Sequence, residues 1–189
     1  MSNTEIEKRF YVKNRNALIG RLKEKGKKIY ENHQIDSYYT PSHRNFVEER
    51  YPFEWLRLRE QNKKYILTYK HWYPERVKES THCDEFETSI SDKSSFVRII
   101  EALDFKKIVT VDKLRLAYSI KGFEVSIDEV KELGTFVEIE IKSEYNSIDD
   151  AIMKIYELAK ELKLNELPKN HPVRTGYPLP LYRKLYESK

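Results

Sequence analysis

Hydrophobic and polar residues alternate at every second position through much of this chain. This period is typical of β-strands that bury one face. Turn residues and prolines bound the alternating segments. We predict eight strands, over residues 5–12, 27–41, 55–60, 63–72, 81–90, 108–120, 122–130 and 135–144.

Three other segments carry apolar residues at helical spacing. The first has Asn14 or Asn16 as its N-cap and Gly26 at its C-terminal end. The last begins with a capping box formed by Ser147 and Asp150. We predict helices over residues 14–26, 91–105 and 147–162.

Short turns join most consecutive strands, which predicts antiparallel pairing. This many antiparallel strands in one domain would curl or close, because closure removes exposed edges. We therefore predict an α+β fold, an eight-stranded antiparallel β-barrel with helices on its outside. A single domain would span residues 1–189, with strands and helices over about 4–165. The proline- and tyrosine-rich tail, residues 166–189, would be a packed terminus, a lid over one mouth or a dimer contact.

Charged residues gather on one face of each predicted strand. The period of two places Glu5, Glu7 and Arg9 together on the first strand, opposite Ile6 and Phe10. The EIE of this strand and a second EIE near residue 140 could pair in space. Later strands carry similar polar stripes: Arg57 with Arg59, Thr68 with Lys70, Glu85 with Glu87, Lys113 with Arg115, Glu124 with Ser126 and Asp128, and Glu138 with Glu140 and Lys142.

A solvated sheet face explains any single stripe of this kind. Two features of the whole set favour a charged interior instead. The amphipathic helices need an apolar surface, and the acidic and basic residues segregate by strand. A charged interior is costly unless it is wet, paired and used. Carboxylate pairs suit Mg²⁺ or Mn²⁺, and arginines and lysines suit phosphate oxygens. The pattern therefore predicts a site for a metal-bound polyphosphate.

The ordered motifs resemble those of the CYTH superfamily, the triphosphate tunnel metalloenzymes. The hallmark ExExK is EIEKR here, over residues 5–9. LRLR, YILTYK, DEFET, VDKLRLAY, IDEV and FVEIEIK follow in the family's order, so the resemblance covers roughly residues 5–162. Arg9 replaces the hallmark lysine. A planar guanidinium is not equivalent to a compact ammonium, and Lys8 points to the other face of the strand.

The resemblance implies an eight-stranded tunnel that contains a binding site for a metal ion and a triphosphate. It implies metal binding by some combination of carboxylates: Glu5, Glu7, Asp128, Glu138 and Glu140. It implies triphosphate contacts from basic side chains: Arg57, Arg59, Lys70, Lys113 and Arg115, with Lys142 as a further candidate. Catalytic roles would fall to Glu5, Glu7, Arg9 and Asp128. Glu85 and Glu87 would pair with the basic residues or help to bind a second metal ion.

The middle of the chain looks most like the class IV adenylyl cyclases of this superfamily. The resemblance therefore implies an enzyme that uses Mg²⁺ or Mn²⁺ to convert ATP to cyclic AMP and pyrophosphate. A triphosphatase that hydrolyses inorganic triphosphate or thiamine triphosphate is the main alternative. A non-catalytic polyphosphate-binding module is a further alternative, although such a module would tolerate loss of the carboxylates, and both EIE pairs are present.

The bulk composition limits the other function classes. The net charge of +4 is small against 35 basic and 31 acidic residues, so we expect no nucleic-acid partner. His71, His82 and Cys83 match no standard zinc spacing and are interpreted as surface or strand-edge residues. The single cysteine, the lack of a signal-like N-terminus and the lack of a long apolar run predict a cytoplasmic protein without membrane contact. We expect either a monomer or a homodimer.

Overall fold

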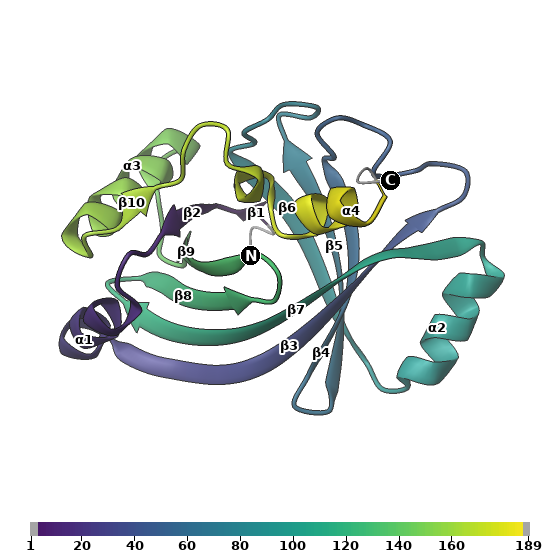
Figure 1. Cartoon of the computed structure of the whole chain (residues 1–189), viewed down its shortest axis with the longest axis horizontal. Coiled ribbons are helices and arrows are strands. Elements are labelled where there is room, and N and C mark those ends of the chain that lie inside the picture. The colour runs from purple at the N-terminus through teal and green to yellow at the C-terminus, as the bar shows by residue number, and fades with distance from the viewer. Residues whose placement is uncertain (1–3, 187–189) are drawn as a thin grey trace.

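The computed structural model describes residues 4–186 and has one large antiparallel sheet with helices beside it (Figure 1). The sheet contains β1 (Thr4–Glu5), β2 (Glu7–Tyr11), β3 (Lys27–Pro41), β4 (Glu54–Gln61), β5 (Lys64–Tyr73), β6 (His82–Ile90), β7 (Phe105–Ile120), β8 (Phe123–Val130), β9 (Gly134–Ile141) and β10 (Asn165–Glu166). The helices are α1 (Arg15–Lys25), α2 (Lys93–Ala102), α3 (Ile148–Glu161), the 3-10 helix η1 (Pro172–Thr175) and α4 (Pro178–Tyr186).

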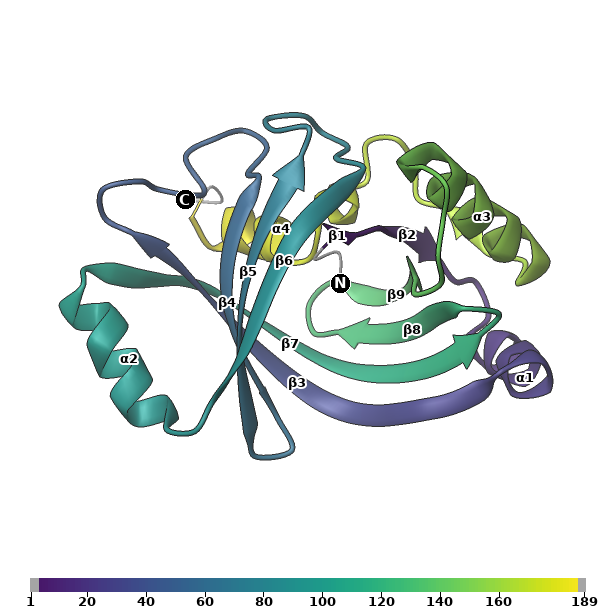
Figure 2. The same ribbon diagram turned by 180° about the vertical axis from the view of Figure 1, so that it is seen from behind.

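The strand order is β1-β6-β5-β4-β3-β7-β8-β9-β2-β10. Only Ile6 separates β1 from β2, yet β1 pairs with β6 and β2 pairs with β9. The N-terminal segment therefore divides its pairing between the two sides of the sheet. The predicted antiparallel fold is confirmed, but the sheet is curled, and no continuous ladder among residues 4–186 closes it into a barrel (Figures 1 and 2).

Two tight turns explain how the charged stripes stay in register. Lys121 and Gly122 join β7 to β8 with positive φ angles of 51° and 80°. A Cβ on Gly122 would also lie 2.6 Å from the Cβ of Ser143, so only glycine fits there. The predicted strands 55–60 and 63–72 leave Gln61 and Asn62 for the turn between β4 and β5. In the structure the positive φ angles fall one residue later, on Asn62 and Lys63.

The predicted helices form with caps close to those expected. The side chain of Asn14, and not that of Asn16, accepts a hydrogen bond from the backbone of Ala17 at 3.0 Å and begins α1. The hydroxyl of Ser147 accepts one from the backbone of Asp150 at 3.1 Å and begins α3. These bonds satisfy amide groups that the first turn of a helix leaves unpaired.

Helices α1 and α3 cover the outer face of the sheet. Their buried leucines and isoleucines pack on the apolar side of β2, β7, β8 and β9. The shared core contains Ile6, Phe10, Val125, Ile127 and Ile139 from the strands and Leu18, Leu22, Ile155, Leu158 and Leu162 from the helices or their ends. Because alternate residues of a strand face opposite ways, the charged stripes point to the inside of the curl, as predicted.

The C-terminal segment packs against the inner face. The described part of the proline- and tyrosine-rich tail forms η1 and α4, and α4 lies beside β7 (Figure 1). A second core joins it to the sheet and closes one end of the curl with apolar groups; its members include Tyr38, Trp55, Val109, Val111, Phe136, Leu167, Val173, Tyr177, Leu179 and Leu181. The described part of the tail is therefore a packed terminus.

Among residues 4–186, no helix is both long enough and apolar enough to cross a membrane.

Candidate active site

A cavity of about 280 Å³ lies inside the curled sheet and is lined mainly by charged side chains. The side chains come from all the strands β1 to β10, and also from α3, loops and the C-terminal segment. Every residue that the sequence predicted for the site lines this cavity, except Asp128. The strands have therefore brought together charges that are up to 137 positions apart in the chain, from Glu5 to Lys142.

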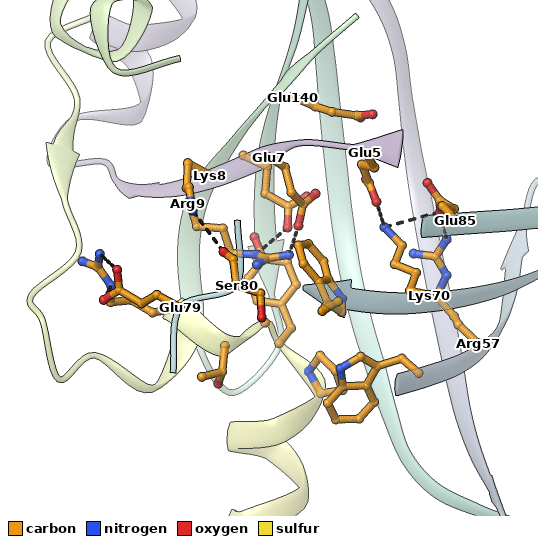
Figure 3. Close-up of a pocket in the computed structure, with 18 of the residues that line it drawn as sticks. Glu5, Glu7, Lys8, Arg9, Arg57, Lys70, Glu79, Ser80, Glu85 and Glu140 are labelled. Carbon is orange, nitrogen blue, oxygen red and sulfur yellow. Dashed lines mark hydrogen bonds and ion pairs between the residues drawn. The ribbon is translucent and has the colours of Figure 1, made fainter. Parts of the chain in front are cut away.

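The two EIE segments pair as predicted. In the β2–β9 ladder, Glu7 lies opposite Glu140 and Arg9 lies opposite Glu138. The Nε of Arg9 donates to Glu138 at 2.7 Å, and its Nη2 donates to Glu7 (Figure 3). The guanidinium at position 9 thus bridges two carboxylates. A lysine ammonium, which lacks the planar fork, would not reproduce this geometry.

A second ion-pair group lies where β1 meets β5 and β6. The ammonium of Lys70 donates to Glu5 and lies 3.3 Å from Glu85 (Figure 3). The thiol of Cys83 donates to the same Glu5 carboxylate at 3.2 Å. Burial would raise the pKa of Glu5, but the charge and hydrogen bond of Lys70 outweigh it and lower that pKa to about 2. Glu5 is therefore ionised at neutral pH.

Strand β7 supplies the most deeply held cations. Arg115 donates to both oxygens of Asp128, at 2.6 and 2.5 Å, and also to Glu138. Lys113 donates to Asp128 at 3.2 Å. Asp128 is fully buried behind these two residues and does not line the cavity. Asp128 therefore holds Arg115 and Lys113 in place, while the metal-binding and catalytic roles that the resemblance implies for it stay predictions.

Strand β4 carries two further cations of the cavity, Arg57 and Arg59. The Nη2 of Arg57 donates to Thr68 at 2.9 Å and to Glu87 at 3.3 Å, and lies 3.7 Å from Glu85. Its buried Nε has no hydrogen-bond partner within the part of the chain that the structure describes. Glu85 and Glu87 therefore pair with basic residues, which was one of their two predicted roles.

Arg59 is held differently from Arg57. It makes two hydrogen bonds to Asp36, at 2.7 and 2.8 Å, and Asp36 is almost fully buried. Burial would raise the pKa of Asp36, but Arg59 outweighs it and holds that pKa well below its usual range. The sequence pattern did not indicate Asp36, because neither of its neighbours at two-residue spacing, Gln34 and Tyr38, is charged.

Burial, together with the crowding of like charges, raises pKa values on the acidic side of the cavity. Burial raises the pKa of Glu7 to about 7, against the effect of Arg9, and Glu138 and Glu5 add to the rise. Burial and the charges of Glu5 and Glu7 raise the pKa of Glu140 to about 8, although Lys142 opposes them. Adjacent carboxylates that raise one another's pKa values are relieved by a bound cation.

The basic side shows the complementary effect. Burial and the neighbouring Arg115 lower the pKa of Lys113 to about 8, despite its contact with Asp128. Cations crowded in this way favour a bound anion, because the anion stabilises their charged forms.

The residues present fit a hard divalent cation by their chemistry. Glu5, Glu7, Glu138 and Glu140 all line one side of the cavity and offer carboxylate oxygens, the ligands that Mg²⁺ and Mn²⁺ prefer. Over residues 4–186, no three acidic, histidine or cysteine side chains are already arranged as a metal-binding group, because the carboxylates pair with Arg9, Arg115, Lys70 and Lys142. A cation would exchange with some of these partners.

Several aromatic side chains also line the cavity, and the sequence pattern did not predict them: Tyr30, Tyr38, Tyr51, Trp55, Trp72, Tyr156 and Tyr177. A signal existed for two of them. Trp55 stands two residues before Arg57, and Trp72 stands two residues after Lys70, so the period of two places each on the inner face. No local pattern indicates Tyr177, which lies in the predicted tail.

The remaining candidates lie at the edges of the site or outside it. Cys83 is fully buried against Glu5, so its interpretation as a surface or strand-edge residue was wrong. His71 and His82 stack on either side of Tyr73. The ammonium of Lys8 donates to the carbonyl of Ser80 at 3.2 Å at the rim of the cavity (Figure 3).

Residues 3–170 match the sequence model of the CYTH domain family. The matched range contains every predicted site residue and all of the sheet. The chain belongs to the CYTH family. A protein of Methanocaldococcus jannaschii named "Putative adenylate cyclase MJ0240" is 31% identical to this CYTH chain over 175 residues, which are 92% of this chain and 95% of that protein.

Solved structures share the CYTH fold seen here. The PH1819 protein of Pyrococcus horikoshii is 26% identical with a TM-score of 0.75, and the match covers 98% of this chain and 99% of that one. HpAC1 of Hippeastrum is 19% identical with a TM-score of 0.58, over 94% of this chain and 98% of that one. HpAC1 is described as a "putative adenylyl cyclase" with a dominant triphosphatase activity. At this identity the likeness shows the fold alone.

Proposed function

We propose that this CYTH protein is a metal-dependent enzyme that acts on a triphosphate, with ATP converted to cyclic AMP and pyrophosphate as in class IV adenylyl cyclases. The observation that carries the proposal is the cavity itself. It brings the basic side chains of Arg57, Lys113 and Arg115 into one space with the carboxylates of Glu7 and Glu138. A polyphosphate bound through a cation needs both kinds of group.

The basic side chains supply the phosphate contacts in this proposal. Arg57 supports it most directly, because its buried Nε lacks an acceptor among the described residues while the same guanidinium lines the cavity. A phosphate oxygen would accept from that group. Asp128 and Asp36 hold Arg115 and Arg59 in fixed orientations, so these cations are oriented before a substrate arrives.

The carboxylates of Glu5, Glu7, Glu138 and Glu140 would hold Mg²⁺ or Mn²⁺. When bound, the cation neutralises charge on the phosphate oxygens and polarises the phosphorus that is attacked. Arg9 crosses between Glu7 and Glu138 and keeps both carboxylates turned toward the cavity.

The aromatic side chains favour a nucleoside triphosphate over a bare phosphate chain. Tyr38, Trp55 and Trp72 line the same cavity as the cations, and Trp72 lies beside Lys70, whose ammonium is 5.8 Å from its ring centroid. An aromatic face is a common platform for a base. In the reaction, the ribose 3′-oxygen bonds to the α-phosphorus and the bond to the bridging oxygen breaks. The hydroxyl proton passes to solvent, and pyrophosphate leaves.

Triphosphate hydrolysis is the second candidate. In this reaction a water molecule attacks the terminal phosphorus, and the cations of the cavity would be sufficient for binding. The description of HpAC1 favours it, because that protein shares the fold and is reported to act mainly as a triphosphatase. A cytoplasmic location and a monomeric or homodimeric state remain predictions that accompany either activity.

A product assay tests the proposal. The purified protein would be incubated with Mg²⁺ or Mn²⁺ and, separately, ATP, thiamine triphosphate and inorganic triphosphate. We expect cyclic AMP and pyrophosphate from ATP, and no turnover when a chelator removes the metal. The exposed Arg98 on α2 offers a matched control, since Arg98→Ala should behave as the wild type whereas Arg57→Ala should not.

The other outcomes are equally informative. Orthophosphate release that is fastest from inorganic triphosphate would replace the cyclase by the triphosphatase. Tight binding of all three compounds without any product would identify a non-catalytic polyphosphate-binding module. Activity that persists fully in chelator would contradict the proposed metal dependence.

A further inference from the structure

Tyr177 belongs to the C-terminal segment but lies in the wall of the charged cavity. It follows Gly176, whose φ of 96° turns the chain, and directly precedes α4. Its side chain is only 4% exposed and belongs to the apolar core that closes one end of the curl. Its ring centroid is 5.8 Å from that of Phe136 on β9. The C-terminal segment therefore places one aromatic residue at the inner end of the site.

Two cations of the site contact the ring of Tyr177. The guanidinium carbon of Arg9 lies 5.2 Å from the ring centroid, and the Nζ of Lys113 lies 5.1 Å from it. Arg9 comes from β2 and Lys113 from β7, so the ring links two strands that do not pair with each other. Contacts of this kind are attractive, because the face of an aromatic ring carries partial negative charge.

The hydroxyl of Tyr177 has no hydrogen-bond partner among residues 4–186, although it is buried. Asp128 and Glu138 are near enough to raise its pKa further, after burial, and Arg9 and Arg115 are near enough to oppose them. A buried hydroxyl without a partner is uncommon and calls for an explanation. Packing alone does not provide one, because phenylalanine would fill the same space without the unpaired group.

We propose that Tyr177 is a substrate-contacting residue whose hydroxyl donates a hydrogen bond to a phosphate oxygen held beside Arg9 and Lys113. The inference rests on the proposed function, since it assumes that the cavity binds a triphosphate. A phosphate oxygen near two cations is a strong acceptor for a phenol. The C-terminal segment then does more than close the end of the curl, because it contributes a polar contact that the strands do not supply.

The test replaces tyrosine by phenylalanine in the full-length protein. Inorganic triphosphate is the probe, titrated calorimetrically in the presence of Mg²⁺ into the wild type and Tyr177→Phe. We expect the dissociation constant to rise about tenfold, as for loss of one hydrogen bond to a charged acceptor. The unfolding temperature without triphosphate should not fall, because the hydroxyl makes no hydrogen bond within the described residues 4–186. The matched control is Tyr182→Phe on α4, which does not line the cavity and should bind as the wild type does.

The outcomes separate this inference from the proposed function. Equal affinity of the wild type and Tyr177→Phe for triphosphate would overturn the inference and leave the proposed function intact. A clear fall in the unfolding temperature of Tyr177→Phe would also overturn it, since the hydroxyl would then bond within the protein. If the wild type fails to bind inorganic triphosphate at all, the proposed function itself fails, and the role of Tyr177 fails with it.

Discussion

Charged side chains inside the curl occur in linked pairs. Arg9 connects Glu7 with Glu138, and Arg115 connects Glu138 with Asp128. Buried ion pairs contribute little net stability, because desolvation offsets their attraction. We therefore infer that this network orients charged groups for binding rather than stabilises the fold. A triphosphate and its cation would exchange partners with groups that are already oriented, which lowers the cost of binding.

Replacement of Arg57 by alanine should weaken triphosphate binding. Its guanidinium lines the cavity, and its Nε has no acceptor in the described part of the chain. A hydrogen bond to a charged group contributes on the order of 1.5–3 kcal/mol. We therefore expect Arg57→Ala to raise the dissociation constant of inorganic triphosphate by at least about tenfold in calorimetric titration. Arg98→Ala is the control on the outer helix α2. An unchanged affinity of Arg57→Ala would show that β4 is not part of the phosphate-binding wall.

Replacement of Glu7 by glutamine should abolish turnover and preserve the fold. Glutamine keeps the shape of Glu7 but offers a cation no charged ligand. Because burial already raises the pKa of Glu7 to about 7, a neutral side chain should be tolerated at this position. Product formation and circular dichroism would be measured on the same sample. Full activity of Glu7→Gln would contradict the assignment of this carboxylate to the metal.

At the scale of the elements, α3 is an amphipathic helix that packs on the outer face of the sheet. One face of α3 buries Ala151, Ile155 and Leu158, while Met153 points to solvent and is 56% exposed. The helix covers β2 and β9, which carry Glu7 and Glu138 on their inner faces. Packing on the outside therefore holds the acidic side of the cavity in register.

Truncation of the buried face of α3 should destabilise the whole protein. Leu158 is 3% exposed, and removal of a buried leucine side chain costs roughly 2–5 kcal/mol through lost contacts and a cavity. Chemical denaturation of Leu158→Ala should report a loss of this size. Met153→Ala on the exposed face of the same helix should change the free energy of unfolding by less than about 0.5 kcal/mol. Equal losses in both variants would mean that α3 packs differently.

At the scale of the whole molecule, the cavity concentrates charges that the unfolded chain would disperse. A ligand that needs several strands at once binds the folded state and not the unfolded chain, so it stabilises the fold. The strands that line the cavity extend from β1 to β10, and the C-terminal segment closes one end. A bound triphosphate would therefore stabilise the entire fold rather than one element.

Thermal unfolding measures this coupling directly. Inorganic triphosphate with Mg²⁺, at a hundred times its dissociation constant, should stabilise the protein by about 2.7 kcal/mol. For a chain of 189 residues this corresponds to a rise of roughly 5–10 °C in the unfolding temperature. Orthophosphate at matched ionic strength is the control and should shift the temperature much less. Equal shifts would indicate a general salt effect and no specific site.

The strand pattern and the faces of the strands could be predicted from the sequence, because both follow from local geometry. Alternation placed Glu5, Glu7 and Arg9 on one face, and the matching EIE segments pair as expected. Helix caps such as Asn14 and Ser147 are also local, since their hydrogen bonds span three residues. Most charged residues of the cavity were therefore predictable from the sequence.

The partners within the cavity were decided only by the tertiary structure. Asp36 meets Arg59, and Asp128 lies behind Arg115, because the register of neighbouring strands sets which side chains meet. Tyr177 reaches Arg9 because the chain returns across the sheet after α3, and no local pattern records that return. The sequence by itself determined which residues face inward, since this depends on the period of a strand. The tertiary structure decided which of them are paired, buried or left with an unpaired group, since this depends on contacts between residues far apart in the chain.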